Sequence, residues 1–261
     1  MLNLQLVSNY LYHIFKAKTR HGIHSPFVYR LIDEVIYDFE KKEDYIPIEN
    51  LRNELLQDER FITITDLGAG SHINNNKEKQ IKSLAKNALK PARLAQLIFR
   101  LVKRFSSENI LELGTCLGIT TAYLAKAAAQ SRLMSIEGCP QTAAVAQENL
   151  NKLNIQNAEL LVGNFDEILP AVIAKNEELD FVFIDGNHRE QATLNYFNWC
   201  LPKLSKNGVM IFDDIYWSRG MKRAWKQIKD HPQVTVTIDL FWIGLVFIRS
   251  EQTKEHFKIR F

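Results

Sequence analysis

Four polar residues with possible chemical roles follow two neighbouring apolar runs in the second half of the sequence. Asp185 and His188 follow the first run, and Asp213 and Asp214 follow the second. Strands of a parallel sheet bind ligands at their carboxyl ends, so we expect these residues to converge. Three carboxylates in one place repel each other unless they are protonated, hydrogen-bonded or bridged by a cation. The pattern indicates a site for Mg²⁺ or another divalent cation at Asp185, Asp213 and Asp214.

The same residues also allow a reaction without metal. His188 could act as a general base near neutral pH, with Asp185 beside it as a second catalytic residue. Asp214 could instead cap the next segment, and His188 could cap the following helix. The sequence leaves the metal route and the histidine route open.

A glycine-containing turn, Glu112-Leu-Gly-Thr-Cys-Leu-Gly118, is the second place where chemistry is expected. Gly114 and Gly118 allow a tight turn and a close approach of the backbone to a ligand. Cys116 stands where a dinucleotide-binding loop requires its second glycine, and the Gly-Lys-Ser/Thr of a phosphate-binding loop is absent. A cofactor without phosphate, S-adenosylmethionine, fits this turn better. Glu112 is expected to meet its cationic end, directly or through water.

Glu137 ends the next apolar run, and 137 − 112 places it 25 residues after Glu112. A carboxylate at the end of the second strand can accept hydrogen bonds from both ribose hydroxyls. Alone this signal is weak, because acids are common at strand ends. Together with Glu112 it favours a nucleoside-containing cofactor.

Short apolar runs alternate with helical segments from residue 109 onward, which predicts a parallel sheet with helical crossovers. The connection between the last two runs is too short for a crossover, so they should pair antiparallel. The expected fold is α/β: a Rossmann-like, seven-stranded, mostly parallel sheet that ends in an antiparallel hairpin. The seven expected strands are 109–113, 133–137, 158–162, 179–184, 208–212, 234–240 and 241–248.

Residues 1–105 have a different character and are expected to form a mainly helical extension, a possible cap on the substrate side, before a domain at 106–261. Ser25 followed by Pro26 predicts the start of a helix. A second glycine turn, Asp66-Leu-Gly-Ala-Gly-Ser71, matches the usual cofactor-loop pattern more closely than the turn at 112 does. No strand, helix, strand and acid follow it in order, so a structural turn is the favoured interpretation.

The bulk composition is that of an ordinary globular protein. The chain has 261 residues, 46% hydrophobic and 24% charged, with a net charge of +3 and no long basic run. A nucleic-acid partner is therefore not expected. Nor is a membrane partner, because no apolar stretch approaches the roughly 20 residues that span a bilayer. Three widely separated cysteines favour a reducing compartment and a cytoplasmic location. The expected partner is a small molecule, and a homodimer is left open.

Five ordered stretches resemble the class I S-adenosylmethionine-dependent methyltransferases, and in particular their catechol O-methyltransferase-like branch. The whole chain also resembles uncharacterised bacterial members that carry an N-terminal His21-Gly-Ile-His-Ser-Pro-Phe27 segment. Each motif is loose alone, whereas five in order are fairly specific. The matching stretches are 111–121, 135–138, 163–166, 183–188 and 211–214.

This resemblance implies a full set of cofactor contacts and a metal site. Asp185, Asp213 and Asp214 align with the metal ligands of the catechol branch, whose third ligand is usually asparagine. His188 occupies the position of that branch's catalytic lysine. The set of expected cofactor contacts comprises Glu112, Gly114, Thr115, Gly118, Thr120, Glu137, Gly138, Gly163, Asn164, Phe165, Asp166 and Asp185. Within this set the resemblance assigns the methionine carboxylate to Gly114, Thr115 and Thr120, and the adenine wall to 163–166.

The expected function is O-methylation of a small molecule. Two alternatives remain open at this point. One is a methyltransferase that acts on nitrogen or on RNA. The other is a catalytically silent S-adenosylmethionine-binding protein whose N-terminal region binds a partner.

Overall fold

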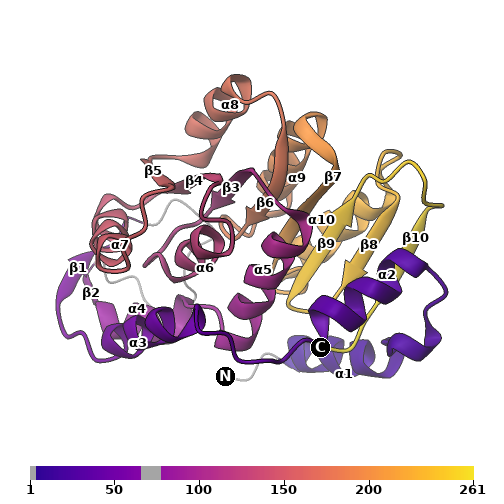
Figure 1. The fold of residues 1–261 in the computed structure, drawn as a ribbon, viewed down its shortest axis with the longest axis horizontal. Coiled ribbons are helices and arrows are strands. Elements are labelled where there is room, and N and C mark those ends of the chain that lie inside the picture. Colours follow the sequence, from indigo (N-terminus) through magenta and orange to yellow (C-terminus); the bar gives the residue numbers. More distant parts are fainter. Residues whose placement is uncertain (1–3, 66–77) are drawn as a thin grey trace. The chain divides into compact units, whose positions relative to one another are not determined.

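The computed structural model describes residues 4–65 and 78–261, and Figure 1 shows its elements in chain order. Internal contacts divide the chain into two compact units. We call residues 40–177 the central unit, and residues 1–39 together with 178–261 the terminal unit. The predicted boundary at residues 105 and 106 is a different division, and it stays a prediction.

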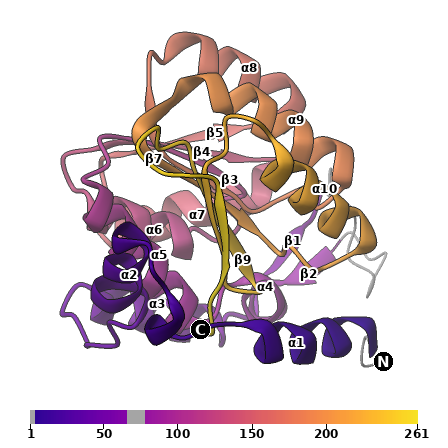
Figure 2. The same cartoon turned by 90° about the vertical axis from the view of Figure 1, so that its right-hand side faces the viewer.

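The central unit carries the glycine turn. Strands β3, β4 and β5 are parallel, and β1 pairs antiparallel with β2. Figures 1 and 2 show α8 on one face of β4 and β5, with α6 and α7 on the other. The elements are α3 (Tyr45–Leu55), β1 (Phe61–Thr63), β2 (Glu78–Gln80), α4 (Ile81–Ala88), α5 (Ala92–Phe105), β3 (Asn109–Leu113), α6 (Ile119–Ala127), β4 (Arg132–Glu137), α7 (Pro140–Lys152), β5 (Ala158–Val162) and α8 (Phe165–Lys175).

The terminal unit carries the acids and His188. Its strands lie in the order β10-β8-β9-β7-β6, with β6 parallel to β7. Helices α9 and α10 pack against each other. The elements are α1 (Leu4–Lys16), η1 (Arg20–Gly22), α2 (Pro26–Leu31), η2 (Ile32–Ile36), β6 (Leu179–Ile184), α9 (Glu190–Cys200), η3 (Leu201–Lys203), β7 (Leu204–Asp213), α10 (Arg219–Asp230), β8 (Val236–Asp239), β9 (Ile243–Phe247) and β10 (Glu255–Lys258).

The predicted C-terminal hairpin is confirmed. Strand β9 pairs antiparallel with both β7 and β8. All seven predicted strands form, and β10 adds one more at the edge, parallel to β8. Its sequence, Glu255-His-Phe-Lys258, is short and charged, which is why hydrophobic patterning did not predict it.

A buried polar cluster at the end of β8 fastens the first helix. The Asp239 carboxylate lies 3.3 Å from Nδ1 of His13 and accepts a hydrogen bond of 2.6 Å from the Tyr216 hydroxyl. Lys258 Nζ lies 3.1 Å from the same carboxylate. Burial alone would raise the pKa of Asp239, but the His13 hydrogen bond, the Lys258 charge and the Tyr216 hydrogen bond lower it to about 2. The cluster therefore holds an ionised acid inside the terminal unit.

The N-terminal predictions have mixed outcomes. Ser25 caps α2 through a 3.4 Å bond from the Val28 N–H, with Pro26 at the first helical position, as predicted. The segment around Pro91 forms two helices, α4 and α5, because proline favours a break there. The rival turn at Asp66–Ser71 lies outside the described residues. Among the described helices, none is both long enough and apolar enough to cross a bilayer.

Candidate cofactor loop and acid cluster

Three parallel strands of the central unit bring the predicted cofactor residues to one edge. Leu113 of β3 pairs with Ile136 of β4, and Glu137 of β4 pairs with Val162 of β5. The next residues along these strands begin the turns at Gly114, Gly138 and Gly163. The three turns therefore lie in neighbouring positions, as the order of the motifs predicted.

The turn after β3 requires glycine at two positions. Gly114 has φ 103° and Gly118 has φ 80°, both in the left-handed region that glycine tolerates best. A Cβ on Gly118 would also lie 3.2 Å from the Cβ of Ala146 and 3.3 Å from its Cα, so α7 packs directly against the turn. Cys116 adopts φ 50°, which is uncommon for a residue with a side chain.

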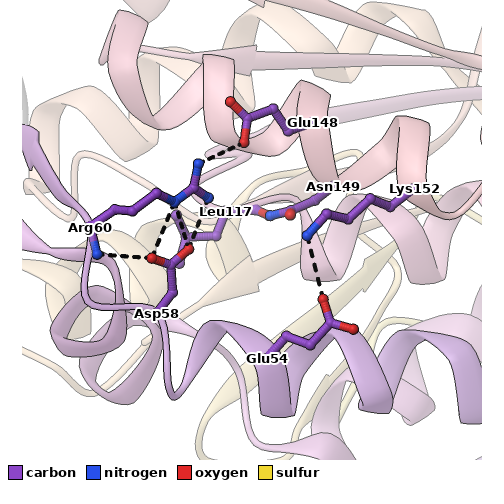
Figure 3. A network of polar contacts seen from close by, with 7 residues as sticks. All are labelled: Glu54, Asp58, Arg60, Leu117, Glu148, Asn149 and Lys152. Carbon is purple, nitrogen blue, oxygen red and sulfur yellow. Dashed lines mark hydrogen bonds and ion pairs between the residues drawn. The ribbon is translucent and has the colours of Figure 1, made fainter.

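Helix α7 also supports the turn by a buried hydrogen bond. Asn149 donates from Nδ2 to the carbonyl oxygen of Leu117 at 2.9 Å, and Asn149 is 1% exposed. Figure 3 shows this bond beside two ion pairs that α7 makes on its exposed side, from Glu148 to Arg60 and from Lys152 to Glu54. Helix α7 thus contacts both the cofactor turn and the segment that precedes β1.

Glu112 is fully buried. One carboxylate oxygen accepts hydrogen bonds of 2.6 Å from the hydroxyls of both Thr121 and Ser135, and the Ser135 hydroxyl lies 2.5 Å from that of Thr115. The carboxylate therefore joins the end of β3 to α6 and β4. With no exposed surface here, Glu112 orders the turn, and its predicted contact with cofactor stays a prediction.

Glu137 lies where the β3 and β4 turns meet. Its two carboxylate oxygens accept backbone N–H bonds from Cys116 and Cys139, each at 2.8 Å. These bonds fix the orientation of the carboxylate. Each oxygen retains a further lone pair, so the pair of ribose hydroxyls expected here can still be accepted.

The third turn, after β5, contains the residue that caps the next helix. Asn164 accepts the N–H of Asp166 on its side-chain oxygen at 3.0 Å and so starts α8 at Phe165. Gly163 has φ 150° and donates its N–H to the Glu137 carbonyl at 2.9 Å. Helix α6 differs, because its N-cap Gly118 makes no side-chain cap bond. The first N–H groups of α6, near Thr120, are suited to a carboxylate ligand.

The terminal unit places three of the four predicted polar residues together. Ile184 pairs with Phe212, so Asp185 and Asp213 are the next residues of parallel neighbours. His188 Nε2 lies 3.8 Å from Oδ1 of Asp185. Asp185, His188 and Asp213 each offer one ligand atom, and these atoms lie within 4.8 Å of one another. We call these three residues the acid–histidine cluster.

A tight turn returns His188 toward Asp185. Asn187 adopts φ 50°, which asparagine tolerates better than most residues, and its Nδ2 donates to the Tyr196 hydroxyl at 2.8 Å. Asp214 follows Asp213 with φ 53°, and its N–H donates to the Trp242 carbonyl at 2.7 Å. Asp214 does not join the acid–histidine cluster, so the structure groups His188, rather than Asp214, with the two other acids.

The donor set of the cluster fits a divalent cation. Two carboxylates and one imidazole supply three ligands, and a six-coordinate ion would retain further positions for water or for acceptor oxygens. Asp213 is buried and the other two residues are half-buried, so the ligand atoms sit at the border between protein and solvent.

Sequence reasoning missed three supporting residues: Thr121, Ser135 and Asn149. Ser135 was visible as a polar residue inside an apolar strand, and Asn149 as a polar residue on the apolar side of an amphipathic helix. No sequence signal tells which buried partner such a residue meets.

About half of this chain is similar in sequence to known proteins. Residues 111–215 match the family model described as a methyltransferase domain. The resemblance to class I methyltransferases of the catechol type is confirmed. A catechol O-methyltransferase of Niastella koreensis is 34% identical over 111 residues, which cover 41% of this chain and 49% of the relative. One from Mycobacterium tuberculosis is 24% identical over 160 residues, covering 56% and 71%.

The chain thus spans about half the length of the first of these relatives. Among solved structures, the O-methyltransferase of Bacillus cereus in complex with SAH, the demethylated form of the cofactor, aligns with a TM-score of 0.57. It is 20% identical to this chain, and the alignment covers 81% of this chain and 93% of that one. This likeness shows the fold: the Rossmann-like, mainly parallel arrangement with an added helical N-terminal region is the one predicted.

Proposed function

We propose that this protein is an S-adenosylmethionine-dependent O-methyltransferase that acts on a small molecule. The observation that carries the proposal is the edge of the central unit, where the Gly114–Gly118 turn, Glu137 and Gly163 lie on adjacent parallel strands. The methyltransferase family match over the same residues supports it, as do the O-methyltransferase names of the relatives.

Each turn has a part in holding the cofactor. The uncapped N–H groups at the start of α6, with Gly114, Thr115 and Thr120, would bind the methionine carboxylate. Glu137, already oriented by two backbone N–H groups, would accept the ribose hydroxyls. Glu112 would act through Thr121 and Ser135 by holding the turn in shape. Gly138, the adenine wall at 163–166 and Asp185 would supply the remaining contacts.

The reaction is a displacement at carbon. The acceptor oxygen forms a bond to the methyl carbon as the carbon–sulfur bond breaks, and the bonding pair goes to sulfur, which becomes a neutral thioether. The hydroxyl proton must leave, so the enzyme positions the acceptor and lowers the cost of that deprotonation. A divalent cation at Asp185 and Asp213 would supply this by lowering the pKa of a bound hydroxyl. His188, 3.8 Å from Asp185, would take the proton or join the ligands.

The cofactor part can be tested without knowing the acceptor. Cys116 is half-buried in the turn, whereas Cys139 and Cys200 are buried, and burial raises the pKa of the Cys200 thiol to about 12. An alkylating reagent should therefore label Cys116 first. Saturating SAH should slow that labelling about tenfold, and Glu137→Gln should remove the protection. Unchanged labelling, with no heat of SAH binding by calorimetry, would contradict the proposal.

The catalytic part needs a transfer assay. Tritiated methyl groups from S-adenosylmethionine should appear on hydroxyl-bearing small molecules, with Asp185→Asn as the matched inactive variant. Binding of SAH without any transfer would favour the silent binding protein. Transfer to RNA or to amines would favour the other alternative.

The acceptor, location and assembly belong to the same proposal. The acceptor is a small hydroxylated molecule, in keeping with the names of the relatives. We place the protein in the cytoplasm, because three widely spaced cysteines suit a reducing compartment. A homodimer remains an open proposal, and sedimentation of the full chain would test it.

A further inference from the structure

We infer that His188 is a ligand of the cation and that the acid–histidine cluster therefore selects a transition metal, such as Co²⁺ or Mn²⁺, over Mg²⁺. This inference rests on the proposed function and assigns its metal. It differs from the ligand set expected from sequence, in which Asp185, Asp213 and Asp214 hold Mg²⁺ or another divalent cation and His188 acts as a base.

Distances favour this assignment. His188 Nε2 lies 3.8 Å from the Asp185 carboxylate, and the three ligand atoms of the cluster lie within 4.8 Å of one another. Ligands about 2.1 Å from one ion lie about 3 Å apart when adjacent and about 4.2 Å apart when opposite. The Asp185–His188 separation lies between these two values, so the side chains can reach one ion by closing in around it. Asp214 is not in the cluster, so the imidazole takes the third position.

The backbone favours the same arrangement. The left-handed Asn187, tied to Tyr196 on α9, forms the turn that carries His188 back to the end of β6. His188 immediately precedes the N-cap of α9, Arg189, whose carbonyl accepts the Thr193 hydroxyl at 2.9 Å. Helix α9 and the turn thus fix the backbone position from which the imidazole reaches toward Asp185.

Donor chemistry turns this geometry into selectivity. Mg²⁺ prefers oxygen ligands and retains its waters, whereas imidazole nitrogen favours the later first-row metals. A site of one nitrogen and two oxygens should therefore bind Co²⁺ and Mn²⁺ more tightly than an all-oxygen site would, with little gain for Mg²⁺. The later position of Co²⁺ in the affinity series predicts a larger gain for Co²⁺ than for Mn²⁺.

The test measures cation binding on the full chain, without turnover. Calorimetry with Co²⁺ and with Mg²⁺ gives two dissociation constants, and Mn²⁺ binding is followed by electron paramagnetic resonance. We expect Co²⁺ to bind about 100-fold more tightly than Mg²⁺. His188→Ala should reduce this ratio to about 10-fold or less by weakening Co²⁺, while the Mg²⁺ constant changes less than about threefold.

Two further variants keep the test decisive. His188→Gln retains an oxygen donor that reaches about as far as Nε2, so it should preserve Mg²⁺ binding and still lose the Co²⁺ preference. His24→Ala removes an exposed histidine elsewhere in the same unit and should leave both constants unchanged, which controls for incidental metal binding.

An equal affinity for Co²⁺ and Mg²⁺, a ratio that survives His188→Ala, or no cation binding at all would overturn the inference. These outcomes are separate from failure of the proposed function. A protein that binds SAH and transfers methyl groups but shows no Co²⁺ preference loses only this inference. If the protein does not bind SAH and does not transfer methyl groups, the proposed function is wrong, whatever its dissociation constants for Co²⁺ and Mg²⁺.

Discussion

The cofactor edge of the central unit and the acid–histidine cluster of the terminal unit are built in opposite ways. At the first, backbone groups and left-handed glycines make the surface, and the polar side chains behind it bind each other, as Glu112 does with Thr121 and Ser135. At the second, side chains present the ligand atoms themselves. An edge shaped by backbone should be most sensitive to changes of shape, with Glu137 as the side chain on which it also depends. A cluster made of side chains tolerates small changes of shape but not of ligand atoms.

The largest effect should come from changing the shape of the cofactor turn. Gly118→Val introduces a branched side chain at φ 80° and against the backbone of α7. We expect SAH binding to weaken more than about 100-fold and the free energy of unfolding to fall by roughly 2–4 kcal/mol. Calorimetry and denaturant unfolding measure both. The control is Gly22→Ala, where the nearest atom to a new Cβ is 3.5 Å away on the flexible Lys18 side chain. Near-normal binding by Gly118→Val would show that shape does not set this edge.

The second prediction removes one ligand atom. Asp213→Asn replaces a buried carboxylate oxygen with an amide of the same shape, so cation affinity should fall about 30-fold while the fold persists. Asp214→Asn alters the adjacent residue, which lies outside the cluster, and should change the affinity less than about threefold. Titration with Mn²⁺ measures the dissociation constant of each variant. A comparable fall in affinity for both variants would restore the ligand set predicted from sequence, which contains both acids.

A third prediction concerns support from α7, shown in Figure 3. Asn149→Ala leaves the buried Leu117 carbonyl without its donor, so the turn should loosen. We expect SAH affinity to fall about tenfold and the free energy of unfolding to fall by about 1–2 kcal/mol. Glu148→Ala, which breaks only an exposed ion pair with Arg60, should change both by little. Equal effects of the two variants would mean that the hydrogen bond from Asn149 to Leu117 has no specific part in SAH binding.

The last prediction concerns a dependence of stability on pH in the terminal unit. The folded pKa of Asp239, about 2, lies below its usual value of 3.8. A lowered folded pKa contributes stability above the unfolded pKa, so this contribution should be complete above about pH 4 and disappear as pH falls toward 2. It amounts to about 2 kcal/mol. Acid unfolding of the parent chain and of Asp239→Asn should differ in slope within this window. Parallel curves would show that ionisation of Asp239 does not contribute to stability in acid.

Sequence patterning predicted most of the parallel arrangement because each strand is a short apolar run and each helix fills the interval between two runs. It also placed Glu112, Glu137, Asp185 and Asp213 at or near strand ends, since an acid beside an apolar run usually marks the end of a strand, although Glu112 and Asp213 are themselves buried. It missed β10 and β2, whose charged residues carry no such pattern.

The sequence by itself determined which residues lie at the ends of the strands, because the alternation of apolar and polar segments is a local property. Only the tertiary structure decided which side chains meet there. Strand register placed Ser135 beside Glu112, helix packing placed Asn149 on Leu117, and the left-handed backbone at Asn187 brought His188 rather than Asp214 to the two aspartates. Those pairings depend on segments far apart in sequence and on single backbone angles, neither of which hydrophobic periodicity records.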